Sequence, residues 1–117
     1  MLTIGWFSTG RDEAARQLLR VVYQKIQGGE INCRIDFVFS NREPGEEEQS
    51  DLFSDLVRSY QIPLVCFSSQ KFKDLSGLPA RPEEAELRQW RLKYDRQVME
   101  RLQEFHSDFV YWPVTCL

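Results

Sequence analysis

The sequence predicts an α/β fold with a doubly wound, Rossmann-like parallel sheet of about four strands and three helices. Short apolar runs alternate along the chain with segments whose apolar residues recur every three or four positions, the periods of strands and amphipathic helices. Strands separated by helices pair in parallel through right-handed crossovers. The length of 117 residues fits a single small domain, residues 1–117.

Four strands are expected from the apolar runs. Residues 2–7 form a mostly apolar run that ends in a Ser-Thr-Gly turn, and residues 34–39 alternate before becoming continuously apolar. Residues 64–67 follow an Ile-Pro break, and a last strand begins at Phe109.

Three helices are expected between these strands. One apolar face runs through residues 15–26 and stops at a Gly-Gly pair, and a second runs through residues 52–60. The third begins with proline and two glutamates and holds its apolar stripe over residues 82–105. Residues 71–81 contain Gly77 and Pro79 among polar side chains and are predicted to form a loop.

Charge and composition exclude several classes of partner. The net charge is −3 and no basic run is present, so nucleic acid is not an expected partner. No apolar stretch reaches the roughly 20 residues that span a bilayer, and no signal peptide opens the chain, which predicts no membrane association and a cytoplasmic location. The acidic run around Glu46 is interpreted as a solvated helix start.

The three cysteines are odd in number and far apart. This spacing favours reduced thiols over a disulfide framework or a zinc site, so no metal is expected. We expect Cys33 and Cys66 to be small buried side chains.

The loop after the first strand is the strongest candidate for a ligand site. Ligands of open parallel sheets bind beyond the carboxyl ends of the strands. Ser8, Thr9, Gly10 and Arg11 offer hydroxyls, a permissive backbone and a cation at a helix N-terminus, which suits a phosphate. The alternative is a Ser or Thr helix cap followed by acidic first-turn residues, which needs no ligand. The sequence alone leaves both interpretations open.

Other candidate sites are weaker. Residues 40–45 and 68–71 lie at the same predicted sheet edge. His106, with Asp108 nearby, lies at a helix end, where a cation complements the dipole. The chain contains no nucleophile elbow, dinucleotide fingerprint or P-loop, and no catalytic residues are assigned.

The order of these signals resembles the glycinamide ribonucleotide transformylase family. The resemblance is carried by short segments in matching order over nearly the whole chain: Ile4-Gly5-Trp6-Phe7-Ser8-Thr9-Gly10-Arg11, Phe37-Val38-Phe39-Ser40-Asn41-Arg42, Tyr60-Gln61-Ile62-Pro63, Tyr94-Asp95-Arg96 and Ser107-Asp108-Phe109-Val110.

The resemblance implies a function in purine synthesis. Family members transfer a formyl group from 10-formyltetrahydrofolate to glycinamide ribonucleotide, and their first loop holds the substrate phosphate. It implies a phosphate-binding role for Ser8 to Arg11 and places Arg91 near the ligand cleft. Asp12 and Glu13 stand where the family has its second glycine and a Ser-Asn pair.

The C-terminal segment departs from the family. The corresponding strand of the family continues as Val-Val-Leu-Ala-Gly-Tyr-Met, whereas this chain continues as Val-Tyr-Trp-Pro-Val-Thr-Cys-Leu. Read in another frame, the codons for residues 111–116 begin with Leu and Ala, as the family segment does after its two valines. We therefore hypothesise that residues 111–117 are a frameshifted tail. The chain is then a truncated N-terminal half without the catalytic Asn, His and Asp, inactive alone and with no bound cofactor.

Truncation has a consequence for assembly, because it exposes an unpaired sheet edge through which a homodimer is expected to form. The alternative function is a non-catalytic α/β module that binds a phosphorylated small molecule or a partner protein.

Overall fold

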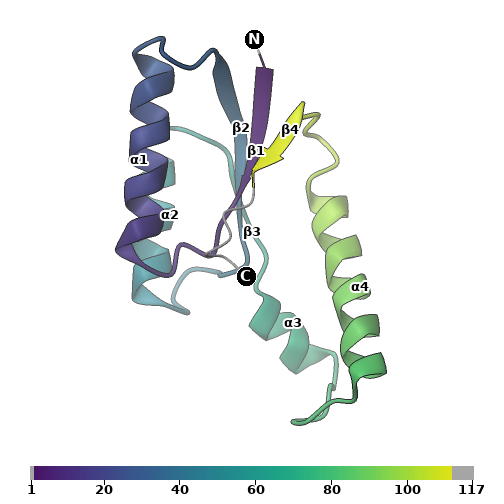
Figure 1. Cartoon of the computed structure of the whole chain (residues 1–117). Coiled ribbons are helices and arrows are strands. Elements are labelled where there is room, and N and C mark those ends of the chain that lie inside the picture. Colours follow the sequence, from purple (N-terminus) through teal and green to yellow (C-terminus); the bar gives the residue numbers. More distant parts are fainter. Residues whose placement is uncertain (1, 112–117) are drawn as a thin grey trace.

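The computed structural model describes residues 2–111 as four helices and one four-stranded, all-parallel sheet (Figure 1). The expected Rossmann-like α/β class is thus confirmed. Of the hypothesised tail, residues 112–117 lie outside the described residues, as does Cys116. The strands are β1 (Leu2–Phe7), β2 (Cys33–Ser40), β3 (Leu64–Cys66) and β4 (Phe109–Tyr111); the helices are α1 (Glu13–Gln27), α2 (Glu48–Ser59), α3 (Ser69–Leu75) and α4 (Glu84–Arg101).

The sheet has the order β3-β2-β1-β4, so β1 and β2 are its central strands. The register between them shifts once, because Ile4 pairs with Ile35 but Gly5 pairs with Phe37. Asp36 is therefore an extra residue in β2, a bulge that resets the side-chain alternation of the strand. As a result Ile35 and Val38 join one core cluster, while Phe37 and Phe39 join the other.

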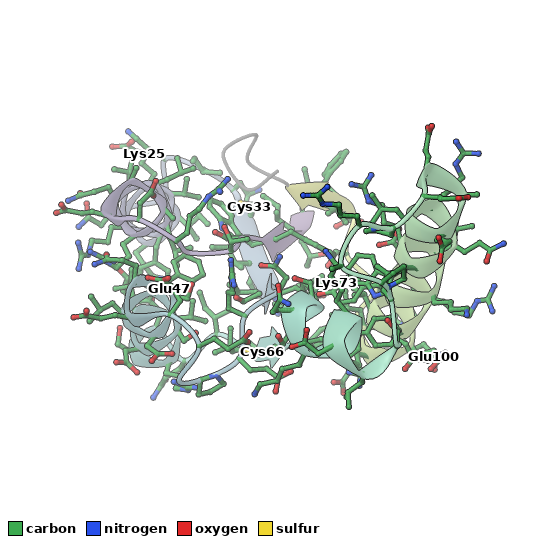
Figure 2. The ribbon with its side chains drawn as sticks, turned by 90° about the horizontal axis from the view of Figure 1, so that it is seen from below. Lys25, Cys33, Glu47, Cys66, Lys73 and Glu100 are labelled. Atoms are coloured by element: carbon green, nitrogen blue, oxygen red, sulfur yellow. The ribbon has the colours of Figure 1, made fainter. Side chains whose placement is uncertain are left out.

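Helices α1 and α2 cover one face of the sheet (Figures 1 and 2). Their buried residues Leu19, Phe53 and Val57 are fully enclosed and pack with Trp6 and Val38. Burying a large apolar side chain contributes about 1.5 to 3 kcal/mol, so this cluster anchors both helices.

Helices α3 and α4 lie on the opposite side of the sheet (Figure 2). The second core cluster joins Val98 and Leu102 of α4 to three strand phenylalanines, Phe7, Phe37 and Phe39. The N-terminal half of α4 and the whole of α3 extend beyond the sheet edge, where they pack on each other through aromatic rings (Figure 1).

Two expected boundaries were wrong. The loop predicted at residues 71–81 is helical up to Leu75, because α3 spans Ser69–Leu75 and the buried Ser68 side chain caps it by accepting a hydrogen bond from the Lys71 N–H. Helix α4 ends at Arg101, so Phe105 lies beyond it, although its ring still packs on Phe37 at 4.8 Å between centroids.

The two cysteines that the structure describes are unpaired, and both lie in the sheet layer (Figure 2). Cys33 is buried, as expected, whereas Cys66 is only half-buried because it lies on the edge strand β3. Burial raises the pKa of both thiols. Within residues 2–111, none of the helices has the length and apolar character needed to cross a membrane.

Candidate functional site at the carboxyl edge of the sheet

The strand order creates a switch point between β1 and β4. The chain leaves β1 for β2 and then β3 on one side, and returns to place β4 on the other side of β1. In open parallel sheets this reversal separates the adjoining loops and marks the ligand crevice at the carboxyl ends of the strands. Ser8, Thr9, Gly10 and Arg11 directly follow β1 and therefore begin at the switch point.

The first loop is held in place by its own hydrogen bonds. Ser8 and Thr9 are buried. The Gly10 N–H donates to the Ser8 Oγ at 3.0 Å, and the Ser50 hydroxyl of α2 donates to the Thr9 carbonyl at 2.8 Å. These contacts fix the backbone between β1 and α1 without a ligand.

Gly10 is required at this turn for two physical reasons. Its φ of +62° lies in the left-handed region that side chains disfavour. A Cβ at this position would also lie 2.6 Å from the Cβ of Phe53, which is fully buried under the loop. The glycine therefore has a structural role that is independent of phosphate.

The N-terminus of α1 carries its own cap. Asp12 Oδ1 accepts a hydrogen bond of 3.0 Å from the Ala15 N–H, while Arg11 is exposed beside it. The aspartate thus satisfies one of the first-turn amides that an anion would otherwise take. This is the cap arrangement that the sequence left open as the alternative, and a phosphate at this loop would depend chiefly on Arg11 and the remaining amides.

A second group of polar side chains joins the loops that follow β2 and β3. Glu43 Oε2 accepts from the Ser68 N–H at 2.8 Å, and Glu46 Oε1 accepts from the Ser68 hydroxyl at 2.7 Å. Lys71 Nζ lies 3.4 Å from Glu43 Oε1. The Ser68 amide, opposed by desolvation and assisted by Lys71, lowers the pKa of Glu43.

These residues were not identified as a group from the sequence. The acidic run does begin α2, with Glu47 as the N-cap and Glu48 exposed, but the expectation that the run is solvated is wrong for Glu46. Glu46 is half-buried and bonded to Ser68, which is fully buried. The only available signal was that residues 40–45 and 68–71 were expected at one sheet edge. Sequence could not show which carboxylates turn inward.

The aromatic residues of α3 and α4 line the other side of this edge. Tyr94 stacks on Phe67 with centroids 5.0 Å apart and on Trp90 at 5.6 Å. Burial raises the pKa of Tyr94, so its hydroxyl stays protonated and donates to the Phe67 carbonyl. Arg91 is exposed on α4, in the helical layer opposite α1, so the structure places it in a different layer from the Ser8–Arg11 loop (Figure 1).

His106 and Asp108 do not act on each other in the structure. Asp108 Oδ2 accepts from the Thr3 N–H at 2.8 Å and so ties the start of β4 to β1, while His106 is exposed. Both precede β4 and lie at the opposite edge from the Ser8 loop (Figure 1). Among residues 2–111, no cluster of three histidine, cysteine or acidic side chains is suited to hold a metal ion.

The fold defines a Rossmann-like α/β protein. Polar loops follow β1, β2 and β3 at the carboxyl edge of its sheet, next to the switch point between β1 and β4. No protein family model, curated protein or solved structure matches the chain. The function is therefore argued from the residues at this edge.

Proposed function

We propose that the chain is a formyltransferase-type domain whose first loop binds the phosphate of a phosphorylated amine such as glycinamide ribonucleotide. The observation that carries the proposal is the position of Ser8 to Arg11 at the carboxyl end of β1, beside the switch point between β1 and β4. The resemblance of the strand-end segments to the glycinamide ribonucleotide transformylase family supplies the substrate class.

We expect no formyl transfer by this chain alone. Its single histidine, His106, precedes β4 and so lies toward the amino edge of the parallel sheet, whereas the Ser8 loop follows β1 at the carboxyl edge, so His106 is not placed as a general base for that loop. No bound cofactor is expected; in the family that the chain resembles, 10-formyltetrahydrofolate is the formyl donor. Measurable turnover with 10-formyltetrahydrofolate and glycinamide ribonucleotide would contradict this.

Binding at the first loop is tested by NMR titration of the full chain with glycinamide ribonucleotide and with its phosphate-free riboside. Only the phosphorylated compound should shift the amide signals of Thr9 to Arg11 in a saturable way. Arg11→Gln should weaken binding about two- to fivefold, the range for an exposed charge pair. Arg88→Gln removes the same charge from α4, where Arg88 pairs with Glu84, and should leave binding unchanged. Equal shifts with both compounds would refute phosphate recognition.

A second candidate is a non-catalytic module that binds a partner protein or a second copy. Within residues 2–111, β4 forms one outer edge of the sheet, and Phe109 and Val110 are 60% and 59% exposed. Unpaired edge strands with apolar side chains favour pairing with another strand. We propose a homodimer through this edge. Light scattering of the full chain should show a mass that rises with concentration, and Val110→Lys should abolish the rise; a constant monomer mass would refute it.

The compartment follows from the same proposal. A formyltransferase-type domain with unpaired Cys33 and Cys66 fits the reducing cytoplasm. Neither nucleic acid nor a membrane is an expected partner; the net charge of −3 disfavours binding to a nucleic-acid backbone.

A further inference from the structure

A cavity of about 370 Å³ lies between α4 and the sheet. Phe7 and Phe39 line it near the carboxyl ends of β1 and β2, and β4 contributes Val110. The volume falls in the lower part of the range for small-molecule sites, which are typically about 300 to 1,000 Å³. The phosphate-binding function proposed above uses none of these residues.

The wall of the cavity is apolar over most of its surface. Phe7 and Phe39 are buried, and the centroids of their rings lie 5.3 Å apart. Val98 of α4 is buried and packs with them, whereas Met99 and Val110 are 66% and 59% exposed. Met99 and Val110 therefore border the side of the cavity that is open to solvent. A flat apolar group of a ligand would meet both aromatic and aliphatic partners here.

Asp95 is the charged residue among the described residues that line the cavity. It lies three positions before Val98 and four before Met99, so its side chain projects from the same side of α4 as theirs. Burial raises the pKa of the Tyr94 hydroxyl, and the negative charge of Asp95 raises it further. Because Tyr94 also lines the cavity, both observations place the carboxylate at the cavity wall.

The Asp95 carboxylate is available to a ligand. The residue is exposed, and within residues 2–111 its side chain has no hydrogen-bond or ion-pair partner. The Tyr94 hydroxyl, by contrast, donates at 2.6 Å to the Phe67 carbonyl, so Tyr94 offers the cavity its ring. A single negative charge beside an apolar cavity favours a ligand that joins a flat apolar group to a cation, and it disfavours an anion.

We propose that this cavity binds an arylalkylamine, a class of compound that carries an aromatic ring system and one ammonium group. The ring packs against Phe7, Phe39 and Val98, and the ammonium lies beside the Asp95 carboxylate. Because the site shares no residue with Ser8 to Arg11, this proposal and the phosphate-binding proposal can fail independently.

The test uses tryptamine as the probe in NMR titrations of the full chain, following the methyl signals of Val98, Met99 and Val110. These signals should shift saturably within about 10 mM, which covers dissociation constants in the millimolar range. The methyl signals of Val21, which is 46% exposed on α1, should not shift. Absence of saturable shifts at the cavity, or equal shifts at Val21, overturns the proposal.

Related compounds separate the contributions of charge and ring. Tryptophol carries a neutral hydroxyl in place of the ammonium and should bind about two- to fivefold more weakly, the range for an exposed charge pair. Indole-3-propionate carries a carboxylate there and should bind more weakly than tryptophol. Hexylamine keeps the ammonium without the ring and should bind about two- to tenfold more weakly than tryptamine, since it loses the aromatic contacts. Equal binding of tryptamine and tryptophol, or of tryptamine and hexylamine, refutes the proposed class of ligand.

A conservative substitution gives a second readout. Asp95→Asn keeps the size of the side chain but removes its charge, so it should weaken tryptamine about two- to fivefold and leave tryptophol unchanged. The matched control is Glu100→Gln, which removes a charge from an exposed residue of α4 that is not among the described lining residues, and it should change neither affinity. If Asp95→Asn affects both compounds equally, or if both variants weaken tryptamine equally, Asp95 does not bind the ammonium and the assignment is overturned.

A second copy of the chain is the competing occupant, because Val110 also belongs to the exposed β4 edge. Dilution of the chain without any compound should leave the Val98 and Met99 signals unchanged. If both signals shift on dilution, a second copy fills the cavity and the proposal fails.

Discussion

The hydroxyl of Tyr94 donates a hydrogen bond of 2.6 Å to the backbone carbonyl of Phe67, while the two rings stack at 5.0 Å. This pair joins α4 to the residue that directly follows β3. It orders the chain as it leaves the sheet edge, just before the capping residue Ser68 begins α3.

Tyr94→Phe should destabilise the protein by about 1 to 2 kcal/mol, because it keeps the ring but leaves a partly buried carbonyl without its donor. The free energy of unfolding in urea measures this loss. Tyr23→Phe makes the same chemical change where the described residues provide no hydrogen-bond partner for the hydroxyl, and should be nearly neutral. Equal losses in both variants would contradict the assigned role of the Tyr94 hydroxyl.

Gly10→Ala should destabilise the protein by about 2 kcal/mol or more. The positive φ alone costs about 1 to 2 kcal/mol for a side chain, and the new methyl group meets Phe53 at 2.6 Å. Gly29→Ala has a similar φ of +79° but open space around its Cβ, so it isolates the backbone cost. Urea unfolding of both variants separates the two contributions, and an equal cost would show that Phe53 yields to the methyl group.

Glu43→Gln should lower stability at neutral pH by about 1 kcal/mol or less, because the carboxylate is partly exposed. The Ser68 amide lowers the folded-state pKa of Glu43 below its ordinary value of 4.5. Its charged form therefore stabilises the fold above about pH 4.5, and this contribution disappears as the pH falls through the lower folded-state pKa.

Unfolding free energies of the wild type and Glu43→Gln should accordingly differ at pH 7 and converge in acid. Glu104→Gln is the control, since Glu104 is exposed and no described residue bonds to its side chain. A difference between wild type and Glu43→Gln that is constant with pH would argue against an ionised Glu43 in the Ser68 contact.

Ser68→Ala should cost about 1 to 2 kcal/mol, because the buried hydroxyl both caps α3 through the Lys71 N–H and donates to Glu46. Hydrogen exchange of the α3 amides should also accelerate in this variant, and more than exchange in the other helices. A purely global loss of stability would accelerate exchange in all helices. Ser76→Ala is the control, because within residues 2–111 its exposed hydroxyl bonds to the Lys73 carbonyl alone. If α3 stays as protected as in the Ser76→Ala control, the cap is not what holds this helix.

The sequence predicted which loops lie at the carboxyl edge of the sheet, but it did not predict the hydrogen bonds between those loops. The position of Ser8 to Arg11 after β1 followed from the change of period at Gly10, since parallel strands end at one edge. The inward turn of Glu43 and Glu46 toward Ser68 was not foreseeable, because an acidic run has the same pattern whether it faces water or a neighbouring loop. Helix α3 was missed for a related reason: it is short, and its cap depends on partners from another loop.

The sequence by itself determined the alternation of strands and helices and the all-parallel pairing that this alternation requires, because hydrophobic period and crossover handedness are local rules. Only the tertiary structure decided that Asp36 is the extra residue at a bulge in β2. The bulge between Ile4 and Gly5 on one side and Ile35 and Phe37 on the other arises from packing two central strands against helices on both faces. No local pattern encodes that one-residue shift, and it is this shift that sends Ile35 to one core cluster and Phe37 to the other.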